Sequence, residues 1–204
     1  MTQMHINLLV AFLTGVVGPL VVMFVREWLE KRKGKKDPIK EELEVATAIT
    51  DRLEEIMHNM KCDRAWLVQF HNGGHFYPTG KSIQKYSMFY EVVSPETISV
   101  QAYHQNIPVN LFSKSLKAIL NKGYIAVPDF EDPNVQNYGM QYIAEEMGTR
   151  SQYVFGIYNI NSKLIGCLGI DYVKRKTRLD QHQINHTQVD AATIGGILYN
   201  HLKK

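Results

Sequence analysis

The stretch that decides the fold is "GTRSQYVFGIYNINSKLIGCLGIDYV", from Gly148 to Val173. It holds two runs rich in β-branched and aromatic residues, 151–158 and 163–173, on either side of the short connection Asn-Ile-Asn-Ser at 159–162. This pattern predicts an antiparallel β-hairpin. Gly166 and Gly169 interrupt the second run, which indicates a bulge or the close approach of a neighbouring group.

A long amphipathic helix is expected over residues 39–60. Asp37-Pro38 provides a helix cap followed by a proline at the first helical position. Apolar residues then recur in steps of three and four, which resembles a coiled-coil seam as much as a core-facing stripe. The helix could therefore carry a dimer contact. The stripe consists of Ile39, Leu43, Ala46, Ile49, Leu53, Ile56 and Met60.

The remaining elements of the soluble part follow from periodicity and from breaker residues. The first two expected strands pair antiparallel across a long loop, 72–84. In the last helix, Gly195-Gly196 costs helix stability, and a close helix–helix contact would explain it. Strands are predicted at 65–70, 85–93, 98–103 and 123–127, and helices at 111–120, 138–148 and 180–202.

The N-terminus predicts one membrane span. Residues 1–25 contain no Lys, Arg, Asp or Glu, and the run 6–25 is as long as a helix that crosses a bilayer. A cleaved signal peptide would show a basic residue before the run and a small-residue cleavage site after it, and neither is present. We expect a tail and transmembrane helix at 1–25, a basic juxtamembrane linker at 26–38 and a folded domain at 39–204.

The distribution of charge predicts the orientation of this span. Residues 26–36 hold six basic and two acidic residues, and no basic residue precedes the span. Under the positive-inside rule, the domain then lies in the cytoplasm, attached to the inner (cytoplasmic) membrane as a single-pass protein. The rest of the chain, 37–204, carries 17 basic and 18 acidic residues. The basic character is thus juxtamembrane, and nucleic-acid binding is not expected.

Three pieces of the soluble part resemble the GAF domain family: "VPDFEDPNV" at 127–135, "GTRSQYVFGIY" at 148–158 and "NSKLIGCLGIDY" at 161–172. The resemblance covers residues 39–202. It implies an α/β (α+β) fold in which an antiparallel sheet carries helices on both faces. It also implies that the first and last helices lie side by side and form a homodimer, with a small-molecule pocket on the opposite face of the sheet.

The resemblance places this pocket between the sheet and residues 127–150. Phe70, Tyr86 and Tyr138 would supply contact area there, and His71, Asp129 and Arg150 would orient a ligand. Arg150 has two possible roles, since a guanidinium suits either an anionic ligand or a structural partner such as Asp129.

The sequence shows no signature of catalysis or of a bound metal or other cofactor. His58, Cys62, His71 and His75 lack a second paired metal motif, and no nucleophile elbow, phosphate-binding loop or paired-carboxylate motif occurs. Cyclic-nucleotide binding by the family needs an Asp-Glu pair where Asn134-Val135 stand. Bilin binding needs a cysteine in the helical segment, whereas Cys167 lies in a predicted strand. We expect a protein that is not an enzyme.

Two functions of different classes remain open. The first is a membrane-tethered sensory or interaction module, dimeric as the family resemblance implies, that acts by binding a small ligand or a protein partner. The alternative is a single-span phage holin-like protein, which this chain is similar to in length and layout. The soluble domain of those holins lies outside the inner membrane, so the predicted cytoplasmic orientation favours the sensor.

Overall fold

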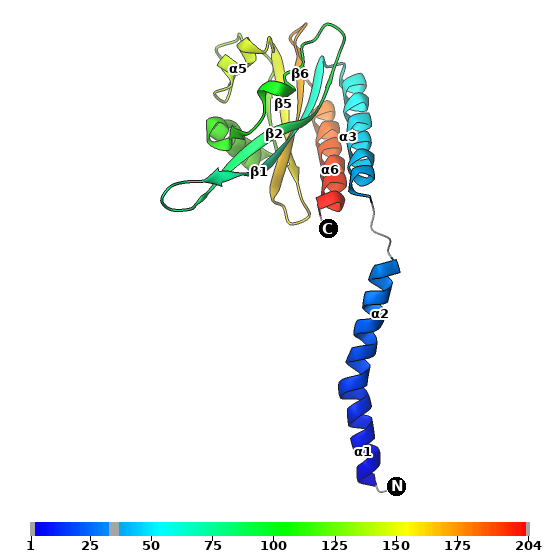
Figure 1. Cartoon of the computed structure of the whole chain (residues 1–204). Coiled ribbons are helices and arrows are strands. Elements are labelled where there is room, and N and C mark those ends of the chain that lie inside the picture. Colours follow the sequence, from blue (N-terminus) through cyan, green and yellow to red (C-terminus); the bar gives the residue numbers. More distant parts are fainter. Residues whose placement is uncertain (1–2, 33–36, 203–204) are drawn as a thin grey trace. The chain divides into compact units, whose positions relative to one another are not determined.

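The computed structural model describes residues 3–32 and 37–202, which divide into two compact units, Met1–Leu43 and Glu44–Lys204 (Figure 1). In the first unit, α1 (Gln3–Phe12) continues through one π turn, Leu13–Val17, into α2 (Gly18–Arg32). Pro19 lies two residues after the end of this turn. A proline ring clashes with the carbonyl group four residues earlier, and a wider π turn accommodates that carbonyl.

This N-terminal helix contains the predicted apolar run 6–25. Between Gln3 and Leu29 it is long and apolar enough to cross a membrane, and its apolar window is not buried in the protein. Lys33, Lys35 and Lys36 of the predicted basic cluster lie outside the described residues.

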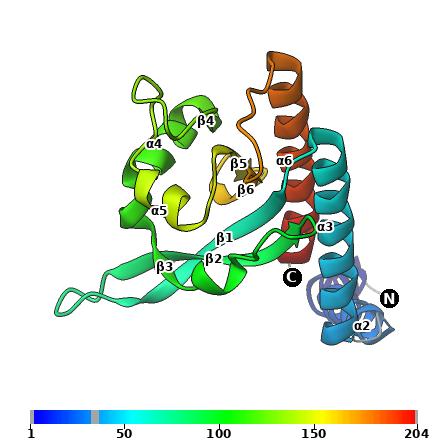
Figure 2. The ribbon, with the colours of Figure 1, turned by 90° about the horizontal axis from the view of Figure 1, so that it is seen from above.

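The second unit is a six-stranded antiparallel sheet in the order β3-β2-β1-β6-β5-β4. Helices cover both faces (Figures 1 and 2). The strands are β1 (Arg64–His75), β2 (Ser82–Val93), β3 (Ile107–Pro108), β4 (Tyr124–Val127), β5 (Ser151–Tyr158) and β6 (Leu164–Tyr172). The helices are α3 (Pro38–Met60), α4 (Ser113–Lys122), α5 (Gln141–Glu146) and α6 (Gln181–Leu202). The predicted fold class is confirmed.

Alternation along the strands creates two hydrophobic cores. In β1, Ala65 and Leu67 pack against α3 and α6, whereas Trp66 and Val68 pack on the opposite face beneath α4 and α5. Successive side chains of a strand point to opposite faces, so one strand serves both cores. The predicted hairpin over 151–173 is confirmed as β5–β6, and Gly148, in the left-handed conformation with φ of 66°, ends the segment before it.

The glycines of β6 mark close packing. A Cβ atom on Gly169 would lie 2.0 Å from the indole of Trp66, and one on Gly166 would lie 2.3 Å from the carbonyl oxygen of Val68. The contact that requires Gly195 in α6 differs from the predicted one. A Cβ atom added at this position would lie 2.9 Å from the carbonyl oxygen of Tyr158 in β5. Gly195 therefore permits a helix–sheet contact rather than a helix–helix contact, and Gly196 faces open space.

Two sequence predictions were wrong in detail. Residues 98–103 are not a strand, because the backbone N–H groups of Val100 and Gln101 donate to the carboxylate of Glu91 instead of to a neighbouring strand. The expected loop 72–84 is mostly strand: β1 and β2 extend to His75 and from Ser82, and the resulting hairpin projects as an arm in Figure 2.

The apolar stripe of α3 has two different environments. Ile49, Leu53 and Ile56 are completely or almost completely buried in the core between α3, α6 and the sheet. Ile39 and Leu43 are 71% and 61% exposed. The C-terminal part of the stripe therefore faces its own core, and only the N-terminal part is available for another chain.

Leu53 and Leu43 allow a matched test of this division. We expect Leu53→Ala to lower the free energy of unfolding of the 37–204 unit by about 2–5 kcal/mol, because it opens a cavity in a packed core. Leu43→Ala, at a position of the same helix that is exposed within one chain, should change it by less than about 0.5 kcal/mol when the unit is diluted to the monomer. Urea denaturation measures both. Equal losses in the two variants would contradict the assignment of the core.

Candidate functional site

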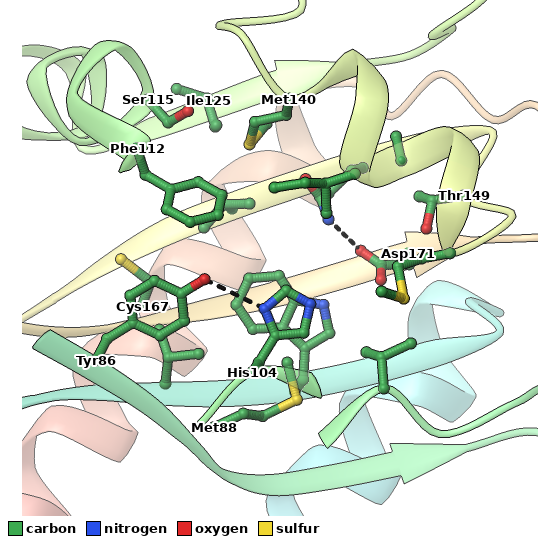
Figure 3. A pocket seen from close by; sticks show the side chains of 18 of the residues that line it. Tyr86, Met88, His104, Phe112, Ser115, Ile125, Met140, Thr149, Cys167 and Asp171 are labelled. Carbon is green, nitrogen blue, oxygen red and sulfur yellow. Dashed lines mark hydrogen bonds between the residues drawn. The ribbon is translucent and has the colours of Figure 1, made fainter. Parts of the chain in front are cut away.

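A cavity of about 80 Å³ lies between the sheet and the layer that contains α4 and α5 (Figure 3). Its wall is mostly apolar and aromatic, with Tyr86 and Met88 from β2 and Phe112 and Met140 from the covering layer. The Tyr86 and Phe112 rings meet edge to face, with centroids 5.4 Å apart. The other apolar lining residues are Trp66, Val68, Phe70, Val100, Leu116, Ile119, Ile125, Ile143, Ala144, Met147 and Val154.

A buried ionic cluster closes one part of this wall. Arg64 opens β1 and is 1% exposed, and it stands directly opposite Asp171 of β6 in the antiparallel register. Its Nη1 atom donates to Oδ2 of Asp171 at 2.8 Å, and its Nε atom lies 3.5 Å from Oε1 of Glu91. Both carboxylate side chains are 2% exposed. One guanidinium thus faces two buried carboxylates.

The same cluster holds the covering segment, which we define as residues 97–105. Nη2 of Arg64 donates to the carbonyl oxygen of Ile98 at 3.0 Å, and Glu91 accepts hydrogen bonds from the backbone N–H groups of Val100 and Gln101. Val100 and His104 of this segment line the cavity. The covering segment is therefore fastened to the cavity wall by charged hydrogen bonds, which are stronger than neutral ones.

Burial tunes the ionisable groups of the wall. Burial raises the pKa of the Asp171 carboxyl, and Arg64, Gln152 and the Trp66 indole limit that rise. Burial lowers the pKa of His104, so its imidazole is neutral near pH 7 and can accept a hydrogen bond from the Tyr86 hydroxyl, 3.2 Å from Nδ1 (Figure 3). Burial also raises the pKa of Tyr86, which keeps that hydroxyl protonated.

The six residues predicted for the pocket do not all meet there. Phe70 and Tyr86 line the cavity, and Tyr138 packs against the same core without lining it. His71 points elsewhere and shares a hydrogen bond with the Ser87 hydroxyl at 2.9 Å. Asp129 forms an ion pair with Lys176 at 3.0 Å, a contact that lowers the pKa of the Asp129 carboxyl. Arg150 is exposed and does not line the cavity.

The charged residues of the wall were missed by sequence reasoning. The predicted strand began at Ala65, one residue after Arg64. Asp171 was included near the end of the predicted strand 163–173, and no role was assigned to its charge. A signal was present, since a basic and an acidic residue each border a strand that is otherwise apolar. Only the pairing of β1 with β6, which are about a hundred residues apart, brings them together.

The two cysteines lie on opposite faces of the sheet. Cys62 belongs to the core beside α3 and α6, and Cys167 lines the cavity. Burial raises the pKa of each thiol to about 12, so both are protonated and weakly nucleophilic near neutral pH. Within residues 3–32 and 37–202, no group of three or more His, Cys, Asp or Glu side chains is arranged to hold a metal ion.

Comparison with solved structures places this architecture among GAF domains. A far-red cyanobacteriochrome photoreceptor matches with a TM-score of 0.63 and 14% identity over 89% of this chain and 99% of its own. The PixJ GAF domain of Thermosynechococcus elongatus matches with a TM-score of 0.61 and 14% identity over 78% and 88%. The phycocyanobilin-bound GAF domain of a cyanobacterial phytochrome gives 0.61 and 15% over 80% and 88%.

These matches show that the chain has a GAF-like fold. No protein-family model and no curated protein matches the sequence. The likeness is therefore one of three-dimensional structure, at identities where only the fold can be compared.

Arg64 should be essential for stability, whereas Arg150 should not. Arg64→Met leaves Asp171 and Glu91 buried without their cation, and we expect a loss of about 3–5 kcal/mol in the free energy of unfolding. Arg150→Ala, at an exposed site, should change it by less than about 0.5 kcal/mol. Urea denaturation of the soluble unit measures both.

A triple variant separates the charge effect from the loss of packing. Adding Asp171→Asn and Glu91→Gln to Arg64→Met removes the unpaired carboxylates and should recover part of the lost stability. If Arg64→Met costs less than about 1 kcal/mol, the cluster is not the constraint described here.

Proposed function

We propose that this protein is a membrane-tethered sensory module that binds a small molecule in the cavity between the sheet and the α4–α5 layer. The cavity carries the proposal: it is lined by aromatic and aliphatic side chains with a few polar groups, which is the usual composition of a ligand site. The GAF-like fold agrees with a sensory role, since the similar structures include photoreceptor domains.

The sheet offers a direct route from this cavity to the helices on the other face. Trp66 lines the cavity, and its neighbour Leu67 packs in the core of α3 and α6. On β6, Cys167 and Leu168 stand in the same relation. A ligand that shifts these strands would therefore act on α3, which follows the N-terminal helix and its linker in the chain. The proposed output is a change in α3 and α6.

We propose that α3 and α6 also form a homodimer contact. Each helix by itself exposes large apolar side chains, Ile39 and Leu43 on α3 and Val189 on α6, and these support the proposal. An apolar surface without a partner is unfavourable in water, and a second copy of the chain would cover it. Because Leu53 is completely buried in its own core, Leu43 is the position that a dimer test should use.

A binding role is favoured over catalysis. The polar side chains of the wall bond one another, as in the Arg64–Asp171 and Tyr86–His104 pairs, and Cys167 is a protonated thiol. These are features of a structural wall, so we infer that the protein is not an enzyme. Covalent bilin attachment also finds little support, because it would need a reactive cysteine at the cavity. The similar structures described above do not support the holin-like alternative.

Native mass spectrometry of the 37–204 unit purified from cells tests ligand binding and dimerisation together. We expect a dimer that retains a small molecule. Ala144→Leu adds volume at a buried position that lines the cavity and should abolish retention, whereas Ala102→Leu, at an exposed position outside the wall, should preserve it. Leu43→Glu should give monomers. An empty cavity in every preparation would reject the ligand, and unchanged dimers in Leu43→Glu would reject this interface.

The orientation of the protein is a separate prediction. Because six basic residues follow the apolar run 6–25 and none precedes it in this sequence, the domain should lie in the cytoplasm. A reporter fused after Lys204 should be active only in its cytoplasmic form. Activity of a periplasmic or extracellular reporter would reverse the orientation and favour the holin-like alternative.

A further inference from the structure

We infer that the ligand of this cavity is a compact, uncharged and mainly apolar molecule, on the order of one aromatic ring in size. The inference rests on the proposed ligand-binding function and specifies its chemistry. It follows from three properties of the wall: where its charges are, what its polar groups already bond, and how much space it leaves.

The first property, the position of the charges, disfavours a charged ligand because its binding would break a buried ion pair. Arg64 and Asp171 are the fully charged side chains of the wall, and they neutralise each other at 2.8 Å, with Glu91 on the far side of the guanidinium. An anionic ligand that used Arg64 would have to displace one of these carboxylates and leave it buried without a cation. Such an exchange is strongly unfavourable in a buried site.

The second property concerns hydrogen bonds. Asp171 accepts from Arg64 and from Gln152 at 2.9 Å, which occupies both of its oxygens. The Tyr86 hydroxyl is bonded to His104, and the Ser115 hydroxyl donates to the carbonyl oxygen of Tyr138 at 3.2 Å. A ligand whose polar groups are acceptors would have to compete with these protein acceptors for the donors of the wall, because its own polar groups otherwise stay unpaired.

The third property is the space and the kind of surface that remain. A volume of about 80 Å³ limits the occupant to a compact molecule. Trp66, Phe70, Tyr86 and Phe112 present aromatic surface to it, and Met88 and Met140 add adaptable thioether contacts. Such surroundings bind an apolar ring through contact area, without the need for a charge.

The aromatic wall also raises a competing possibility, a small organic cation. Aromatic faces attract cations, and the cluster holds two carboxylates for one guanidinium. His104 adds no positive charge, because burial lowers its pKa. We favour the uncharged ligand because each oxygen of both carboxylates already has a donor: Glu91 accepts from two backbone N–H groups of the covering segment, and Asp171 accepts from Arg64 and Gln152.

Three probes of one size decide among these chemistries: benzyl alcohol, benzoate and benzylammonium. The full-length chain contains two tryptophans, Trp28 and Trp66, so the variant Trp28→Phe leaves the cavity indole as the only reporter. We expect a saturable change in Trp66 emission with benzyl alcohol. The two charged probes should bind at least about tenfold more weakly, because each would bury an unpaired charge.

Two control variants show whether the fluorescence change arises in the cavity. Ala144→Leu should weaken binding of benzyl alcohol, and Ala102→Leu should not. Ile143→Phe, at another lining position of α5, provides a second filled cavity if Ala144→Leu does not fold. A binding curve that neither filled-cavity variant alters would place the probe elsewhere and overturn the inference.

The remaining outcomes each contradict the inference in a distinguishable way. Tighter binding of benzoate would show an anion site, and tighter binding of benzylammonium would show a cation site. Failure of all three probes, together with a charged molecule retained in native mass spectrometry of the full chain, would reject the ligand class while the proposed function stands. Failure of all three probes with nothing retained would reject both.

Discussion

The buried guanidinium of Arg64 is the constraint on which the rest of the domain depends. It sits at the start of β1, pairs with Asp171 across the β1–β6 ladder, and reaches Glu91 on β2. Through the carbonyl oxygen of Ile98 it also fastens the covering segment. A buried charge is tolerated only where partners surround it, so the positions of three strands and one irregular segment are determined together.

In this arrangement, the polar and the apolar residues of the cavity wall have different roles. Ion pairs and hydrogen bonds within the protein hold the wall of the cavity and position the covering segment. The apolar and aromatic surface between them remains available for a ligand. The polar residues of this wall therefore act mainly on the structure of the site, and the apolar residues would provide the contact area for the proposed ligand.

Strand alternation links the two faces of the sheet at short range. Each of β1, β5 and β6 has side chains in both hydrophobic cores. A displacement of these strands beneath α4 and α5 would therefore also move the side chains that pack against α3 and α6. Close contacts such as Gly169 against Trp66 and Gly195 against Tyr158 leave little space to absorb such a movement. The tight packing favours transmission across the sheet over local relaxation.

The sequence by itself determined the local elements, because periodicity and breaker residues act over a few neighbours. The β5–β6 hairpin and the apolar N-terminal helix could be predicted in this way, and the family resemblance supplied the fold class. Of the residues predicted for the pocket, Phe70 and Tyr86 line the cavity, whereas His71, Asp129 and Arg150 do not. Tertiary structure alone decided the ionic wall and the true partner of Gly195. Those contacts join residues far apart in the chain, and only the register of antiparallel strands determines which of them meet.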